Sequence, residues 1–138
     1  MKLETLQSLV KLKNLKIFQG IHPNIVEYII RNSEREEFRP WDIIIEQGES
    51  SNGKGYIIEA GSVNVYVNKK QTTRLEAGEM FGEIALLNEE ERSATVIAET
   101  QTTTIILSQE ILFKMIEHDD NSINKEIIRR IEENVGDE

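Results

Sequence analysis

The sequence predicts a mainly β protein with flanking helices, in which a jelly-roll β-barrel follows N-terminal helices and precedes two C-terminal helices. Residues 36–107 consist of short runs rich in β-branched residues, separated by glycines and polar clusters. Many short strands at close spacing are typical of a jelly-roll barrel or a sandwich. Before and after this region the apolar residues have helical spacing instead.

Two helices are expected before the barrel. The second of these two helices is expected to begin near Pro23, because proline is well suited to the first turn of a helix. It is expected to end near Asn32 and Ser33. Ile25, Ile29 and Ile30 of this helix are expected to face inward. The first helix is indicated by apolar residues with roughly helical spacing, which are Leu3, Leu6, Leu9, Val10 and Leu12.

Seven strands are expected in the barrel, at residues 37–39, 43–46, 55–59, 62–68, 72–75, 93–98 and 103–107. In the fourth of them polar residues alternate with valines, so the three valines share one face. Trp41 follows Pro40 just before a strand, where it is expected to be a packing anchor. Glycines lie at or between the ends of these runs, where turns often need a positive φ.

Two further helices are expected after the barrel. Ser108 is typical of an N-cap, and the helix that it begins extends to about His118. A final helix at about 121–134 carries an apolar stripe, which consists of Ile123, Ile127, Ile128, Ile131 and Val135. The chain is therefore predicted to be a single domain, residues 1–138, with the barrel at about 36–107 and the C-terminal helices at about 109–134.

Composition and charge exclude several classes of protein. The 138 residues include no cysteine and carry a formal net charge of −9. Such a field repels phosphate backbones, so no nucleic-acid partner is expected. The apolar runs are too short to span a membrane, and the N-terminus is too evenly charged for a secretory signal. We therefore expect a cytoplasmic protein without a membrane partner.

The most unusual segment is residues 78–96, GEMFGEIALLNEEERSATV. The apolar run 84–87 is too short for a buried strand, but as one helical turn it would present the N–H groups of residues 83–86 to an anion. Arg92 can offer a two-pronged contact to the same anion. Glu83 then suits the hydroxyls of a sugar on the same ligand. A phosphate and a ribose hydroxyl on one edge describe a compact nucleotide.

Residues 81–87 followed by 92–96 resemble the phosphate-binding cassette of cyclic nucleotide-binding domains. The resemblance covers about residues 15–134 and includes the turn at 46–49 and the hairpin at 56–63. It implies that Arg92 binds the cyclic phosphate and that Glu83 accepts a hydrogen bond from the ribose 2′-hydroxyl. It assigns further contacts to the backbones of Gly82, Ile84, Ala85 and Ser93, and a pocket lining to Phe81, Ala94 and Val96.

Two positions of the motif bear on ligand choice and affinity. Many members of the family have proline before the arginine, whereas this chain has Glu91, which is expected to weaken binding somewhat. Ser93 after the arginine favours cAMP, although its hydroxyl could also bind the guanine of cGMP. Arg129 and Arg130 are expected to be exposed helix charges, with a cation–π lid over the base as the alternative.

The resemblance implies a cyclic nucleotide receptor rather than an enzyme. Because the sequence shows no effector segment, we expect a stand-alone module whose mobile C-terminal helix contacts a protein effector or forms a homodimer. A ligand-free interaction scaffold of the same fold is the alternative, although the intact Glu83 and Arg92 argue against it. For Arg92 itself the alternative is a surface ion pair with Glu89 or Glu90. A metal enzyme would need several converging histidines, but the chain has two histidines and neither is in a predicted strand, so no metal is expected.

Overall fold

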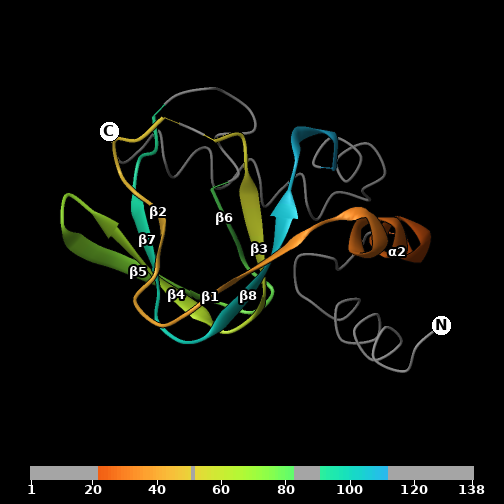
Figure 1. Cartoon of the computed structure of the whole chain (residues 1–138), viewed down its shortest axis with the longest axis horizontal. Helices are drawn as coiled ribbons and strands as arrows, with labels where there is room; N and C mark the ends of the chain where they lie inside the picture. The colour runs from red at the N-terminus through yellow and green to blue at the C-terminus, as the bar shows by residue number, and fades with distance from the viewer. Residues whose placement is uncertain (1–21, 51, 83–90, 112–138) are drawn as a thin grey trace.

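Two four-stranded antiparallel sheets face each other in the computed structural model of this chain, which describes residues 22–50, 52–82 and 91–111 (Figure 1). One helix, α2, lies beside the first sheet. The described elements in chain order are α2 (Pro23–Asn32), β1 (Arg35–Phe38), β2 (Ile43–Ile45), β3 (Gly55–Ala60), β4 (Ser62–Val67), β5 (Lys70–Glu76), β6 (Met80–Phe81), β7 (Thr95–Ala98) and β8 (Thr102–Leu107).

Both sheets are built from strands that are distant in the sequence. The first has the order β1-β8-β3-β6 and the second the order β2-β7-β4-β5. Register in the first sheet brings Tyr56 opposite Phe81, and in the second it brings Val65 opposite Val96. This pairing brings the two ends of the 78–96 segment to the two sheets, since β6 belongs to the first and β7 to the second.

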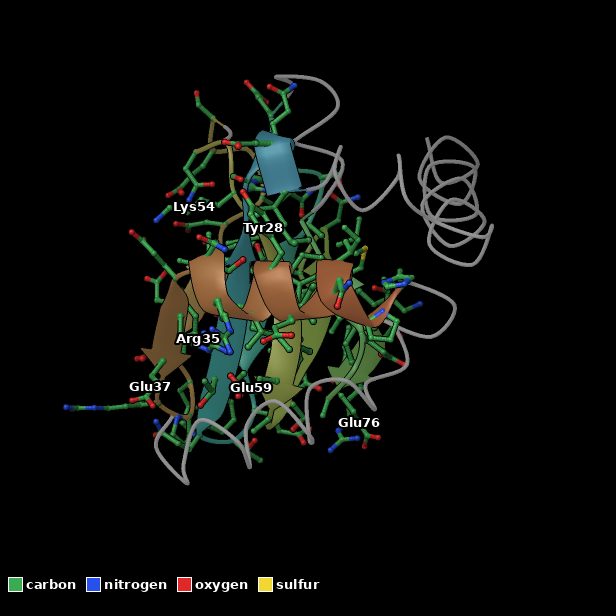
Figure 2. The ribbon with its side chains drawn as sticks, turned by 90° about the vertical axis from the view of Figure 1, so that its right-hand side faces the viewer. Tyr28, Arg35, Glu37, Lys54, Glu59 and Glu76 are labelled. Carbon is green, nitrogen blue, oxygen red and sulfur yellow. The ribbon has the colours of Figure 1, made fainter. Side chains whose placement is uncertain are left out.

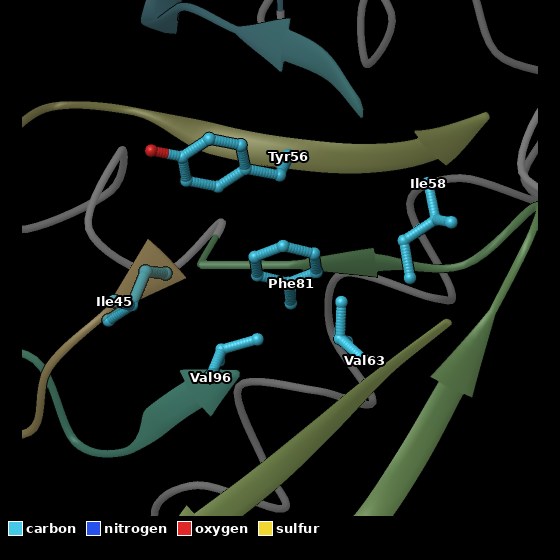
Figure 3. Close-up of a cluster of buried hydrophobic side chains, with 6 residues drawn as sticks. All are labelled: Ile45, Tyr56, Ile58, Val63, Phe81 and Val96. Carbon is cyan, nitrogen blue, oxygen red and sulfur yellow. The ribbon is translucent and has the colours of Figure 1, made fainter. Parts of the chain in front are cut away.

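The core between the sheets is a cluster of buried apolar side chains (Figure 3). Tyr56, Ile58 and Phe81 come from the first sheet and face the second. The second sheet contributes Ile45, Val63 and Val96 to the same cluster. Burial of such side chains is the main favourable contribution to folding, at about 1.5–3 kcal/mol each.

Helix α2 begins as the sequence predicts and packs its apolar face inward. Pro23 stands at its first turn, and the Nδ1 atom of His22 accepts a hydrogen bond of 3.1 Å from the backbone N–H of Asn24. The buried residues are Val26, Ile29 and Ile30. Ile25 is only half-buried, so the expectation that it faces the core is wrong and Val26 takes that position.

Arg35 joins the end of helix α2 to the first sheet (Figure 2). Its Nη1 atom donates a hydrogen bond of 2.9 Å to the carbonyl of Ile30, which lies in the last turn of the helix. Its Nε atom lies 3.4 Å from a carboxylate oxygen of Glu59 on β3. A helix dipole is negative at its C-terminal end, so a cation there is stabilising.

The β3–β4 connection requires glycine. Gly61 has a φ of +97°, and a Cβ at this position would lie 2.5 Å from the carbonyl oxygen of Gln101. No other residue fits that approach. The β4–β5 hairpin turns at Asn68 and Lys69, both with positive φ, which is the geometry that two-residue hairpins prefer.

The strands confirm the mainly β prediction and correct its details. Two facing antiparallel sheets are present, but in the described part of the chain no strand pairing joins them into a closed barrel. Each of the seven expected runs contains a strand, within a few residues of its predicted bounds. Strand β6 was not predicted, because two residues between glycines show no alternation. It forms by pairing with β3.

The helices predicted at 3–12 and 121–134 lie outside the described residues, as does most of the helix predicted from Ser108 to His118. At the start of the latter, the backbone N–H of Ile111 donates a hydrogen bond of 3.2 Å to the Ser108 hydroxyl, which agrees with the expected N-cap. None of the helices in the described ranges is long and apolar enough to cross a membrane.

Candidate functional site

Arg92 is buried where the chain returns toward the second sheet. It lies three residues before β7, and only 8% of it is exposed. A buried charge is costly unless hydrogen bonds replace its water. The alternative that Arg92 lies at the surface is therefore wrong, since its side chain is buried; Glu89 and Glu90, the partners named in that alternative, lie outside the described residues.

The guanidinium group of Arg92 is held by oxygens from two other segments. Its Nη1 atom donates a hydrogen bond of 3.0 Å to the carbonyl of Gly82. Its Nη2 atom donates to Oδ1 of Asn52, at 2.6 Å, and to the carbonyl of Lys54, at 2.8 Å. Charge-assisted bonds of this kind are about twice as strong as neutral ones. Together they fix the plane of the guanidinium.

The backbone of Arg92 is held as well. Its N–H donates a hydrogen bond of 2.9 Å to the carbonyl of Glu49, and its carbonyl accepts one of 2.9 Å from the N–H of Gly48. These two bonds join the approach to β7 to the turn that follows β2. The side chain and the main chain of Arg92 are thus both anchored on the 46–54 connection.

Gly82 leaves room for the guanidinium. Its φ is +73°, a conformation that other L-residues rarely adopt. A Cβ at this position would lie 2.9 Å from Cδ1 of Ile45 and 3.1 Å from Nη1 of Arg92. Glycine therefore allows both the backbone turn and the close approach of the arginine.

Phe81 and Val96, both expected to line the pocket, belong to the core cluster. They are 2% and 3% exposed. The ring of Phe81 stacks on Tyr56 with 5.0 Å between centroids and 15° between planes, as Figure 3 shows. The core thereby fixes the strands on either side of the candidate site, since β6 leads to Gly82 and β7 follows Arg92.

The remaining predicted site residues differ in their exposure and in whether the structure describes them. Ser93 is exposed and Ala94 is half-buried. Glu83, Ile84 and Ala85 lie outside the described residues, and so does the single helical turn expected there. The structure therefore brings Gly82 to Arg92, and Phe81 to Val96 in the core cluster. Glu83, the residue expected to bind the sugar, is outside the described residues.

Sequence reasoning missed Asn52 and Lys54. Both lie in the connection between β2 and β3, some forty residues before Arg92. The carbonyl of Lys54 carries no side-chain signal in the sequence. Asn52 stands before a glycine, a pair typical of turns, which indicates a loop but not a contact with an arginine.

The turn beside Arg92 carries two carboxylates. The pKa of Glu49 is raised above its ordinary value, chiefly because a hydrogen bond with the Glu46 side chain favours the protonated form of Glu49. Among the residues that the structure describes, no group of three or more histidines, aspartates and glutamates is placed to hold a metal ion.

The structure defines a mainly β domain of two facing antiparallel sheets, with a buried arginine beside a positive-φ glycine. The comparison with protein families identifies the family of this domain. The family described as "Cyclic nucleotide-binding domain" matches residues 35–119, more than half of the chain. This protein therefore belongs to the cyclic nucleotide-binding domain family.

Some relatives of this chain are named for cGMP and others for cAMP. The chain is 38% identical over 77 residues to a cGMP-dependent protein kinase of Plasmodium berghei, which covers 56% of this chain and 9% of the kinase. It is 35% identical over 89 residues to a cAMP-dependent protein kinase regulatory subunit of Candida albicans, which covers 64% of this chain and 19% of that subunit. The chain thus spans less than a fifth of the length of either relative.

A solved structure with the same fold supports the assignment. The regulatory domain of Toxoplasma gondii PKA, crystallised with cAMP, superposes with a TM-score of 0.77 at 25% identity. The match covers 93% of this chain and 49% of that one. The similarity extends beyond the residues matched by the family, and it agrees with the two-sheet architecture.

Proposed function

We propose that this domain is a receptor for a cyclic nucleotide and that it binds the ligand's phosphate through Arg92. The observation that carries the proposal is the burial of Arg92 in a cage of protein oxygens beside Gly82. In a chain of net charge −9, an anionic ligand needs a short-range cation that is already in place. Arg92 is such a group.

The proposed contacts follow the motif residue by residue. Arg92 binds the cyclic phosphate and Glu83 the ribose 2′-hydroxyl. The backbones of Gly82, Ile84, Ala85 and Ser93 make further contacts with phosphate and sugar. Phe81, Ala94 and Val96 form the apolar side of the pocket. The domain is proposed to span residues 1–138, and these residues are proposed to suffice for binding as a stand-alone, non-catalytic receptor module.

We propose cAMP as the preferred ligand, with cGMP binding more weakly. Ser93 follows the arginine and is exposed, so its hydroxyl can turn toward a ligand. Relatives named for cGMP and for cAMP both match this chain at similar identity. The two nucleotides must therefore be compared directly.

The proposed output is through the segment 121–134, which lies outside the described residues. Its apolar stripe at Ile123, Ile127 and Ile131 is visible in the sequence, and a helix that short is marginal alone in water. The ligand can change how this segment packs only if it binds the alternative packing arrangements with different affinities. We expect saturating nucleotide to slow amide exchange at 123–134. The proposed binding partner of this segment is a protein effector or a second copy of the domain.

A ligand-free interaction scaffold is the second candidate. One observation favours it: the guanidinium of Arg92 already has protein acceptors at Gly82, Asn52 and Lys54, so it could serve the fold alone. In that case nucleotide would not bind, and the domain would act only through its surface.

Thermal unfolding with added nucleotide separates the two candidates. A ligand that binds only the folded state adds about 2.7 kcal/mol of stability at a hundred times its dissociation constant. The receptor proposal predicts a higher melting temperature with cAMP and a smaller rise with cGMP, for protein stripped of nucleotide by refolding. An unchanged melting temperature at millimolar concentrations of both would support the scaffold.

A further inference from the structure

Arg92 is anchored at both ends by a single connection. We use "clamp loop" for residues 46–50 and 52–54, between β2 and β3. At one end of the clamp loop, Gly48 and Glu49 hydrogen-bond the backbone of Arg92 at 2.9 Å each. At the other end, Asn52 accepts from the guanidinium at 2.6 Å. The arginine is therefore held along its whole length.

Asn52 is itself held in place. Its Oδ1 atom accepts a second hydrogen bond, of 3.1 Å, from the backbone N–H of Lys54. The carbonyl of Lys54 in turn accepts from Nη2 of Arg92 at 2.8 Å. The amide oxygen of Asn52 and the carbonyl oxygen of Lys54 therefore lie in one short turn and both accept from Nη2 of Arg92. Because a hydrogen bond also joins Asn52 to Lys54, the two acceptors are held in place together.

The other end of the clamp loop is attached to the second sheet through Gln47. The Gln47 side chain makes two reciprocal hydrogen bonds with Asn68 at the tip of the β4–β5 hairpin. Nε2 donates to Oδ1 at 3.0 Å, and Oε1 accepts from the Asn68 N–H at 2.8 Å. The backbone N–H of Gln47 also donates to the hydroxyl of Thr95 on β7, at 2.9 Å. The hairpin tip thus supports the turn that holds Arg92.

An arginine side chain loses rotamer freedom when it is fixed in one conformation. If the fold fixes the side chain beforehand, a ligand does not have to, and affinity rises accordingly. Resting on the function proposed above, we propose that Asn52 and Gln47 are positioning residues that orient Arg92 for the phosphate of the nucleotide. Asn52 orients the guanidinium directly, and Gln47 orients the backbone from which it extends.

The first test needs no ligand. In the nitrogen–proton spectrum of the stripped protein, we expect the Nη protons of Arg92, which donate to Gly82, Asn52 and Lys54, to be resolved and to exchange slowly with water. Asn52→Ala should accelerate that exchange at least tenfold, whereas Asn52→Asp, which retains an oxygen acceptor, should keep it slow. Asn32→Ala is the control, because the Asn32 side chain also makes a hydrogen bond, but its Nδ2 donates to the carbonyl of Tyr28 in α2, at 2.8 Å. Unchanged exchange in Asn52→Ala would overturn the inference.

The second test is a double-mutant cycle measured by titration with cAMP. Asn52→Ala should weaken binding about tenfold, which corresponds to 1.4 kcal/mol, and Gln47→Ala should weaken it less. In an Arg92→Ala background, Asn52→Ala should have no further effect, because its role is exercised through the arginine. Equal effects in both backgrounds would show that Asn52 acts by another route and would overturn the inference.

The two tests separate this inference from the function on which it rests. If the wild-type protein bound neither cAMP nor cGMP, the receptor proposal would fail, while the exchange measurement would still decide whether Asn52 orients Arg92. If the wild type bound and Asn52→Ala bound equally well, the receptor proposal would stand and the positioning role would be refuted. Melting temperatures of all variants without ligand identify any general loss of folding.

Discussion

The carbonyl oxygen of Gly82 accepts a hydrogen bond of 3.0 Å from Nη1 of Arg92, and a Cβ on the same glycine would lie 3.1 Å from that nitrogen. Residue 82 therefore binds the guanidinium through its carbonyl group, and it has no room for a side chain of its own beside that guanidinium. This relationship makes Gly82 a sensitive position for testing the site.

Gly82→Ala should displace the guanidinium of Arg92 and weaken nucleotide binding. It should also cost stability, because alanine at a left-handed φ costs about 1–2 kcal/mol and its Cβ meets Ile45. Gly78→Ala is the control for backbone strain, since Gly78 also has a positive φ, of +93°, but lies in the β5–β6 turn, where its N–H donates to the carbonyl of Ile58 and not to Arg92 or its partners. Chemical unfolding and cAMP titration of both variants measure the difference. Equal losses in the two would show that the contact with Arg92 is unimportant.

Arg92→Ala should destabilise the fold as well as reduce binding. The sequence alone leads to the expectation that folding is nearly unaffected, but burial of the guanidinium changes this. Removing it takes a donor from the carbonyls of Gly82 and Lys54, at about 1–3 kcal/mol for a buried unsatisfied group. Urea unfolding measures the loss. A variant as stable as the wild type would mean that water replaces the guanidinium without cost.

Trp41→Gly should stabilise the protein. Trp41 is 80% exposed and has a φ of +75°, so the prediction that it is a packing anchor is wrong. The N–H of Asp42 donates a hydrogen bond of 3.0 Å to the carbonyl of Arg39, which closes a four-residue turn from Arg39 to Asp42. Trp41 is the third residue of this turn, a position with positive φ where glycine is preferred. We expect a gain of about 0.5–1 kcal/mol, since the relief of strain exceeds the entropy cost of glycine.

Trp41→Ala separates strain from the loss of the indole, because it retains the left-handed φ but removes the ring. Urea midpoints of the two variants should place Trp41→Gly above the wild type and Trp41→Ala no higher than the wild type. If Trp41→Gly were the less stable of the two, the indole or the turn would contribute in a way that its exposure does not indicate.

Stability should fall in acid partly through Glu99. A hydrogen bond from Arg74 and, next in size, one from Ser62 lower the pKa of Glu99 below its ordinary value of 4.5. The folded state then binds fewer protons than the unfolded state between the two pKa values. This contribution is present above the unfolded-state pKa and is lost as the pH falls through the folded-state pKa. Glu99→Gln should therefore flatten the decline of the urea midpoint below about pH 4.5.

Glu49 provides a contrast of opposite sign. Its pKa is raised, chiefly by the hydrogen bond with Glu46, so its contribution is present at low pH and is lost as the pH rises. Glu49→Gln should accordingly leave stability in acid unchanged and improve it slightly near neutrality. If both glutamine variants changed the pH profile in the same direction, the hydrogen-bond partners assigned to these carboxylates would be wrong.

Local patterns in the sequence predicted most of the fold. Alternation in Ser62–Val67 and proline at the start of α2 each indicate an element from its own residues. Strand β6 could not be found in this way, since Met80 and Phe81 become a strand only opposite Tyr56 and Ile57. Its existence depends on pairing and not on local pattern.

The resemblance placed Gly82 and Arg92, ten residues apart, in one contiguous motif, but it assigned both to a shared ligand. Their direct hydrogen bond was not predicted. Asn52 contacts the same guanidinium from forty residues away, and an asparagine before a glycine is explained equally well by an ordinary turn. Only the fold brings its amide to the arginine.

Calorimetric titration of the stripped protein with cAMP, for the wild type and for Arg92→Ala, tests the central claim most directly. The account predicts saturable binding at one site per chain. It also predicts affinity at least about a hundredfold lower in the variant, because the loss of two charge-assisted bonds costs about 1.5–3 kcal/mol each. Asn32→Ala, whose amide contacts the carbonyl of Tyr28 in α2, should bind as the wild type does. Binding that is absent in the wild type, or equal in the wild type and Arg92→Ala, would contradict the claim that this domain recognises a cyclic nucleotide through its buried arginine.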